Sequence, residues 1–314
     1  ILRRAAAMYK LAEAPEKTVA SLDAATKLTG LPDATLSLVW TELAEALIVA
    51  QRPADAWKAF NEALKGPNPA STALRYRLGR QFIDTHKTEY MQFGKSLLEQ
   101  IAKQETVTPG EQEHHELALV GLGYEVMRVN NYPEAEVWLR KQIALYPTGS
   151  ESGLGRLFLG ICMLQRAAAT GASAPDATSI ARMRDDAVKL FKQVVTDADT
   201  KQKKEGKLGE RDAWIRIQAG LRVLQTYQQM QKPNDLLAEA STLLERHRNT
   251  VDELIILSLV YHAFKQKNES GRALQTRDQM KELFERLPRS AFPANQGEYS
   301  RGYWEKVWFA PEPK

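Results

Sequence analysis

Three short stretches of the sequence hold residue types that bind phosphates or attack substrates. Residues 94–96 (GKS) end like a phosphate-binding loop, which needs G-x-x-x-x-G-K-S/T so that backbone N–H groups surround the phosphates, but Glu89 stands at the first glycine position. Residues 121–123 and 153–155 (GLG) lack the third glycine of a dinucleotide-binding turn. In residues 149–153 (GSESG) a glutamate occupies the nucleophile position of a hydrolase elbow. These stretches therefore predict no catalytic residue.

Histidines beside carboxylates are the other candidates for chemistry. His114 and His115 lie between Glu113 and Glu116, a composition that suits a metal ion. Neighbouring helical residues point about 100° apart, however, so the two rings cannot share one ion. We interpret this stretch as a solvated helix start. His86, His247 and His262 are isolated in the sequence, and no pair of carboxylates stands in an apolar setting, so we expect no metal site and no cofactor.

The composition gives little support to nucleic acid as a partner. The 314 residues include 43 Lys and Arg against 39 Asp and Glu, a surplus of only +4. A basic cluster at residues 201–211 (KQKKEGKLGER) could meet phosphates or an acidic membrane surface. It contains two glycines and no aromatic residue, so a solvated linker explains it more simply.

The compartment stays open. The single cysteine, Cys162, excludes an internal disulfide but is compatible with both reducing and oxidising surroundings. The longest apolar run, residues 254–261, is far shorter than the roughly 20 residues of a membrane-spanning helix, so we expect no transmembrane segment. The chain begins at Ile1 rather than Met, which leaves room for an upstream signal, anchor or domain. Cytoplasm and periplasm both remain possible for a soluble chain.

Periodic apolar residues predict two antiparallel helices between residues 119 and 147. Apolar side chains recur every three or four positions on both sides of a break at residues 130–133 (NNYP). Pro133 suits the first turn of the second helix. Gly123 and Ala135 are small, which lets the two backbones approach closely. A similar arrangement recurs at residues 38–69, where Leu43, Ala44 and Ala56 take the places of Leu122, Gly123 and Ala135.

This pattern resembles the tetratricopeptide repeat, a helix-turn-helix unit of about 34 residues. Trp40, Leu43, Ala44, Ala56, Phe60 and Ala63 match its signature well, and weaker units follow from residues 9, 78, 159, 223 and 257. The resemblance implies an all-α, right-handed superhelical solenoid of about seven antiparallel helix pairs over residues 1–287. Within it we expect an irregular insertion near residues 167–180 and a basic linker near residues 197–211.

The resemblance also implies a concave groove lined by the first helix of each pair, where a protein or peptide partner would bind. Carried over position by position, the expected groove residues are Thr41, Glu45, Tyr76, Arg80, Tyr124, Met127, Arg128, Leu157 and Ile161. The Lys/Asn clamp that chaperone-binding members use for a terminal carboxylate is not apparent. The helices at residues 117–127 and 154–164 are apolar nearly all round, so either a partner or the fold itself must cover their second face.

The last segment, residues 288–314, departs from the repeat pattern and is rich in aromatic residues. Tyr303, Trp304 and Trp308 belong to a short amphipathic helix. This helix would either cap the open end of the last pair or dock into a groove or a partner.

The sequence therefore predicts a non-enzymatic interaction scaffold that holds a partner segment in its groove. Two alternatives remain: a structural segment of a larger, possibly envelope-associated assembly, and a helical appendage of an enzyme upstream of Ile1. The sequence predicts neither the partner's identity nor the oligomeric state.

Overall fold

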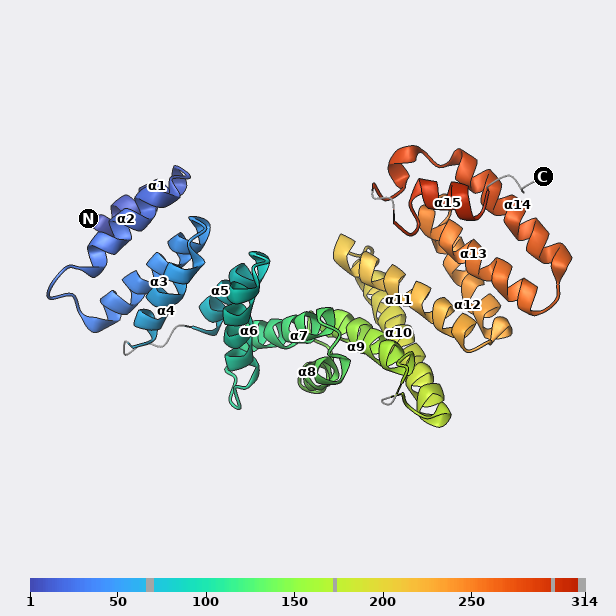
Figure 1. The fold of residues 1–314 in the computed structure, drawn as a ribbon, viewed down its shortest axis with the longest axis horizontal. Helices are drawn as coiled ribbons and strands as arrows, with labels where there is room; N and C mark the ends of the chain where they lie inside the picture. Colours follow the sequence, from blue (N-terminus) through green and yellow to red (C-terminus); the bar gives the residue numbers. More distant parts are fainter. Residues whose placement is uncertain (66–70, 172–173, 295–296, 310–314) are drawn as a thin grey trace. The chain divides into compact units, whose positions relative to one another are not determined.

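The computed structural model describes residues 1–65, 71–171, 174–294 and 297–309. Within these ranges the chain forms α-helices and one short 3₁₀-helix and contains no β-strand. It divides into two compact units, unit 1 (Ile1–Ser152) and unit 2 (Gly153–Lys314). The predicted all-α helical-repeat fold is confirmed, and the predicted helix pairs are found in both units (Figure 1).

Unit 1 consists of four consecutive helix pairs, each with a first and a second helix. The pairs are α1 (Leu2–Leu11) with α2 (Pro15–Thr26), α3 (Asp33–Val49) with α4 (Pro53–Leu64), α5 (Thr72–Asp84) with α6 (Thr88–Ala102), and α7 (Gln112–Arg128) with α8 (Tyr132–Leu145). The helices of each pair are in contact, and the first helices α3, α5 and α7 also contact one another in order. The first helices therefore form a continuous row.

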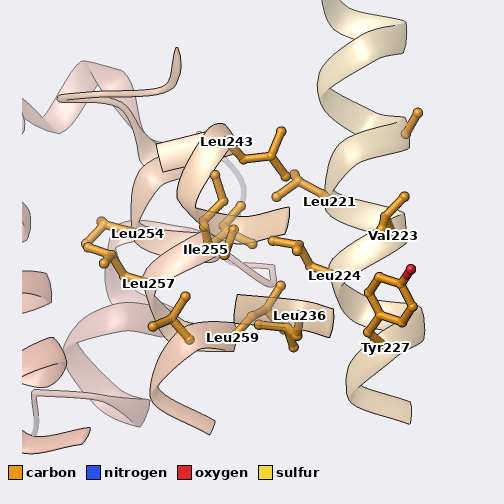
Figure 2. Packing of buried hydrophobic residues seen from close by; sticks show 14 of the residues in the cluster. Leu221, Val223, Leu224, Tyr227, Leu236, Leu243, Leu254, Ile255, Leu257 and Leu259 are labelled. Atoms are coloured by element: carbon orange, nitrogen blue, oxygen red, sulfur yellow. The ribbon is translucent and has the colours of Figure 1, made fainter. Parts of the chain in front are cut away.

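Unit 2 holds three further pairs and a C-terminal helix. They are α9 (Ser152–Ala167) with α10 (Ala177–Glu205), α11 (Glu210–Gln229) with α12 (Pro233–Arg246), and α13 (Val251–Gln266) with α14 (Ser270–Arg286), followed by the 3₁₀-helix η1 (Arg289–Ala291) and α15 (Arg301–Val307). Figure 2 shows the core between them, with Leu224 of α11 directed toward Leu236 of α12 and Ile255 of α13. The apolar faces predicted from helical spacing thus meet in one shared core.

Glycines allow the two helices of a pair to approach closely. A Cβ added to Gly123 would lie 2.6 Å from the side chain of Leu139, and one added to Gly160 would lie 2.5 Å from the ring of Phe191. These are the repeat-like positions that the sequence assigned to the contact between first and second helix. The same relation joins Gly220 of α11 to Leu243 of α12, at 2.9 Å.

Helices α5 and α6 approach each other backbone to backbone, and this contact gives a first prediction. A Cβ on Gly94 would lie 2.5 Å from the carbonyl oxygen of Gly79 and 2.7 Å from Cγ1 of Ile83. Because backbone cannot move aside cheaply, we expect Gly94→Ala to lower the free energy of unfolding by about 1–3 kcal/mol. Gly271→Ala is the control, since nothing lies within 4 Å of a Cβ there. It should instead stabilise the chain by about 0.5–1 kcal/mol in urea titrations.

Five of the turns within the pairs share one backbone conformation. Glu13, Gln51, Asn130, Gln231 and Asn268 each have φ between 53° and 61°, in the left-handed region. The N–H of the residue after each of them donates to a carbonyl five residues earlier, as in Arg52 N–H to Leu47 O at 2.8 Å. This bond closes the end of the first helix and reverses the chain. A proline then lies in the first turn of α2, α4, α8 and α12, as predicted for Pro133.

These left-handed residues carry strain that glycine would remove. We expect Gln231→Gly to raise the free energy of unfolding by up to about 1 kcal/mol, because glycine adopts positive φ without the Cβ clash. Gln229→Gly, in the last helical turn of α11, should lower it by a similar amount. Urea unfolding measures the free energy of unfolding of both variants. If the two substitutions change it equally and in the same direction, Gln231 is not strained.

The region between α9 and α11 differs in part from the expectation. Residues 168–176 connect α9 to α10, and residues 172–173 of the predicted insertion lie outside the described residues. The predicted basic linker at 197–211 is mostly helical, because α10 continues to Glu205 and only residues 206–209 connect it to α11. No Pro or Gly interrupts the sequence from 177 to 205, and Gly206 ends the helix with φ 78°. Arg216 and Arg246 both pair with Asp199 and hold this extension against α11 and α12.

Candidate functional site

A groove opens beside the row of first helices at the N-terminal end of unit 1. It has a volume of about 930 Å³ and is lined by α1, α2, α3 and α5; we call it the N-terminal groove. The first helices contribute most of its lining: Arg3, Arg4, Ala6, Ala7, Lys10, Glu42, Glu45, Ala46, Val49, Arg77 and Gln81. The turn after α1 and helix α2 contribute Glu13, Ala14, Pro15, Thr18 and Leu22. The groove exists because short alanine side chains line it where larger ones would fill the space.

Ion pairs cross the N-terminal groove from helix to helix. Arg3 of α1 donates through Nε to Oε2 of Glu42 on α3 at 3.0 Å. Glu45 of α3 accepts from Arg77 of α5, and its other oxygen lies 3.8 Å from Nζ of Lys10 on α1. Exposed pairs of this kind contribute only about 0–1 kcal/mol each, since water and salt screen them. A ligand could therefore exchange partners with them at little cost.

The predicted groove residues of unit 1 fall into three groups. Glu45 lines the N-terminal groove, and Thr41 lies half-buried one turn earlier on α3. Tyr76 and Arg80 are half-buried on α5, where the Tyr76 ring contacts the His114 ring at 5.8 Å. The exposed residues Tyr124 and Arg128 and the half-buried Met127 lie on α7.

Arg80 and Arg128 meet at a shared acid. Nη1 of Arg128 donates to Oε2 of Glu125 at 2.9 Å, and Nη1 of Arg80 lies 3.8 Å from Oε1 of the same side chain. The sequence predicted Arg80 and Arg128 as groove residues. It did not indicate that both contact the buried carboxylate of Glu125.

The remaining two predicted residues lie in unit 2. Leu157 is only 2% exposed and belongs to the core with Phe191, so it is a packing residue rather than a contact surface. Ile161 is half-buried and packs against the same core. The second face of the apolar α9 is thus covered in large part by the fold itself, one of the two outcomes left open by its composition.

Sequence reasoning missed most of the groove lining. Arg3, Arg4 and Lys10 lie on α1, which the sequence showed only as the remnant of a repeat. An available signal was the alternation of charge between successive first helices. Basic residues at 3, 4 and 10 precede acidic ones at 42 and 45, and basic residues at 75, 77 and 80 follow.

The aromatic C-terminal helix packs on unit 2. Trp304 is fully buried, and its indole N–H donates to the carbonyl oxygen of Tyr299 at 3.2 Å. The Trp308 ring contacts the rings of Tyr261 and His262 on α13 at 5.3 and 5.4 Å, and Tyr303 contacts Tyr299 at 5.8 Å. In this arrangement Trp304 cannot anchor a separate partner. Residues 295–296 and 310–314 of the predicted segment lie outside the described residues.

Buried polar groups at the start of α7 correct the prediction of a solvated helix start. His115 is fully buried, and its Nδ1 shares a hydrogen bond of 2.8 Å with the hydroxyl of Tyr146. Burial, with a smaller effect from the charge of Lys141, lowers the pKa of His115 and keeps the ring neutral at pH 7. The ring faces inward because helix α8 and Tyr146 cover it.

Glu116 is buried beside it and fixes the loop after α8. Its Oε1 accepts from Nε2 of Gln142 at 2.9 Å and from the backbone N–H of Glu151 at 3.0 Å. Burial raises the pKa of Glu116 above its ordinary value, against the opposing effect of these hydrogen bonds. Since Glu151 is buried as well, a substrate could not reach this cluster without opening the loop. Its evident role is to hold the α7–α8 pair and residues 149–151 together.

The raised pKa gives a pH-dependent prediction. Between the ordinary and the raised pKa of Glu116, the folded chain keeps a proton that the unfolded chain has released, so its stability falls as the pH rises through that window. Glu116→Gln retains an oxygen for both donors and cannot ionise. We therefore expect its stability relative to wild type to increase from pH 4.5 toward pH 7. Urea titrations at several pH values measure this difference, and a constant difference would contradict the assignment.

The described ranges were also compared with what a metal site and a membrane-spanning helix require. No group of three or more His, Cys, Asp or Glu side chains in these ranges is arranged to hold a metal ion. None of the described helices is both long and apolar enough to cross a membrane.

Comparison with known proteins adds a likeness of fold. The chain aligns with the crystal structure of a tetratricopeptide repeat protein from Parabacteroides merdae over 90% of its own residues and 91% of the other chain, with 14% identity and a TM-score of 0.45. No protein-family model matches the sequence. No curated protein matches it either. The order of the helices and the glycine contacts within the pairs describe the fold directly, as an all-α helical repeat.

Proposed function

We propose that this chain is a non-enzymatic interaction module that binds a segment of a protein partner in the N-terminal groove. The observation that supports this is a groove of about 930 Å³ along the row of first helices, within the roughly 300–1,000 Å³ typical of ligand sites. Concave faces of helical repeats in general serve as extended binding surfaces. Arg80, Tyr124 and Arg128 would extend the contact along α5 and α7.

The lining of the N-terminal groove suits binding better than catalysis. No histidine or cysteine is among its described lining residues. Its hydroxyl group, on Thr18, donates to the carbonyl oxygen of Ala14 at 3.0 Å within its own helix. Nucleophilic catalysis requires a nucleophile hydrogen-bonded to a base, and this lining does not provide that pair.

Site-specific photocrosslinking tests the proposal. Val49 in the N-terminal groove and Val137 on α8 are exposed to similar extents, 60% and 62%. A photoreactive amino acid at either position, in cells of the source organism, should give a discrete protein adduct at 49 and none of the same mass at 137. The crosslinked peptide of the partner then identifies the bound segment. Identical adducts at both positions, or none at 49, would argue against this groove.

A further inference from the structure

In the ion pairs that cross the N-terminal groove, each acid is less exposed than the base that it contacts. The side chain of Glu45 is 17% exposed, whereas its partners Arg77 and Lys10 are 58% and 72% exposed. Arg3 is likewise more exposed than Glu42, at 43% against 32%. The third acid of the lining, Glu13, is exposed. The face that a ligand would meet therefore has four exposed basic side chains and one exposed acidic one.

The same difference in exposure recurs further along the row of first helices. Glu125 of α7 is 2% exposed, and Arg80 and Arg128, which hold it, are 33% and 38% exposed. A guanidinium has five N–H donors, and a single carboxylate occupies only one or two of them. In Arg80 a second carboxylate is already in place, since Oδ1 of Asp84, whose side chain is 61% exposed, accepts from its Nη2 at 3.3 Å. Arg128 keeps its remaining donors for a ligand, because Glu125 is its one ion-pair partner within the described ranges. The buried acids thus fix the arginines in place and leave hydrogen-bonding capacity outward.

One basic side chain of the groove, that of Arg4, forms no ion pair within the described ranges. Arg4 lines the groove and is exposed, and it forms no hydrogen bond or ion pair within the described ranges. Together with Arg3, Lys10 and Arg77 it gives four basic side chains against three acidic ones. Ala6, Ala7 and Ala46 lie among them and let a ligand backbone approach closely.

From this charge complementarity, and resting on the proposed function, we infer that the groove binds a partner segment that carries Asp or Glu side chains next to small apolar residues. Carboxylates would reach the outward donors of Arg4 and Arg77 in charge-assisted hydrogen bonds. A polyanion such as nucleic acid fits less well, because it needs an extended basic surface and the whole chain is nearly neutral.

Selection from a random 12-residue peptide display library tests the inference with a defined probe. Wild-type chain should enrich peptides with more Asp and Glu than the input library. The double variant Arg4→Gln/Arg77→Gln keeps Lys10 beside Glu45, and circular dichroism checks that its helices form. It should lose that enrichment. Lys58→Gln is the matched control, since Lys58 is 80% exposed on α4, which does not line the groove.

Fluorescence anisotropy then gives the size of the effect for the best selected peptide. We expect the dissociation constant to rise at least about tenfold in the double variant, and in a peptide with Gln in place of its acids, with no change in Lys58→Gln. If neutral or basic peptides bind and the double variant weakens their binding as well, the groove does not select acidic segments. That result would overturn the acidic specificity but not the proposed function. Failure of every selected peptide to respond to the groove variant would count against both.

Discussion

Replacing Trp304 by alanine should destabilise unit 2 by about 3–5 kcal/mol, the cost of removing a large, fully buried aromatic side chain. Its ring lies among those of Tyr299, Tyr303 and Trp308, in the same core that joins α9 to α14. The change also removes the donor to the Tyr299 carbonyl. Urea unfolding followed by circular dichroism measures the loss.

Hydrogen exchange locates the effect of this change. Protection should fall in α13, α14 and α15 and stay unchanged in unit 1, because each helix pair contacts mainly its neighbours. Val307→Ala is the control on the same helix, since Val307 is 57% exposed and should change stability by less than about 0.5 kcal/mol. A loss below 1 kcal/mol for Trp304→Ala would mean that α15 is not an integral cap of unit 2.

Phe60→Ala should have a comparable effect on unit 1, about 3–5 kcal/mol. Phe60 of α4 is fully buried and stacks near Trp57, with ring centroids 6.1 Å apart, in the core beneath α1, α3 and α5. Because those three helices also line the N-terminal groove, partner binding should weaken along with stability. Urea unfolding and peptide binding are the two readouts.

Val137→Ala is the control for Phe60→Ala. Val137 is 62% exposed on α8, outside the described lining of the groove, so neither stability nor binding should change appreciably. Full binding by a Phe60→Ala chain whose unit 1 has lost its hydrogen-exchange protection would show that the partner does not need this groove.

The helix pairs could be predicted because their contacts are local in sequence. Gly123 and Leu139, or Gly160 and Phe191, lie on helices joined directly to each other, and their sizes are complementary. Apolar spacing then sets which face of each helix is buried. The turns were less predictable. Left-handed φ is usually a glycine position, and here Gln51 and Gln231 adopt it, because the bond that closes the helix compensates for the strain.

Contacts between separate pairs were the harder part. The row of first helices places Glu45 beside Lys10 and Arg77, which lie 35 and 32 positions away in the sequence. Helix periodicity within α3 contains no information about which side chains of α1 reach it. The burial of His115 was missed within a single pair, since Tyr146 contacts its ring from the end of the second helix, 31 positions later in the sequence. A charged or polar residue at a helix start normally indicates solvent, and only the packing of α8 changes that.

Hydrogen exchange with and without the bound partner segment is the most direct test that unit 1 functions as an interaction module. We predict slower exchange in α1, α3 and α5 of unit 1, with α4 and the whole of unit 2 unchanged. Slower exchange confined to unit 2 or to α4, with α1, α3 and α5 unaffected, would contradict it.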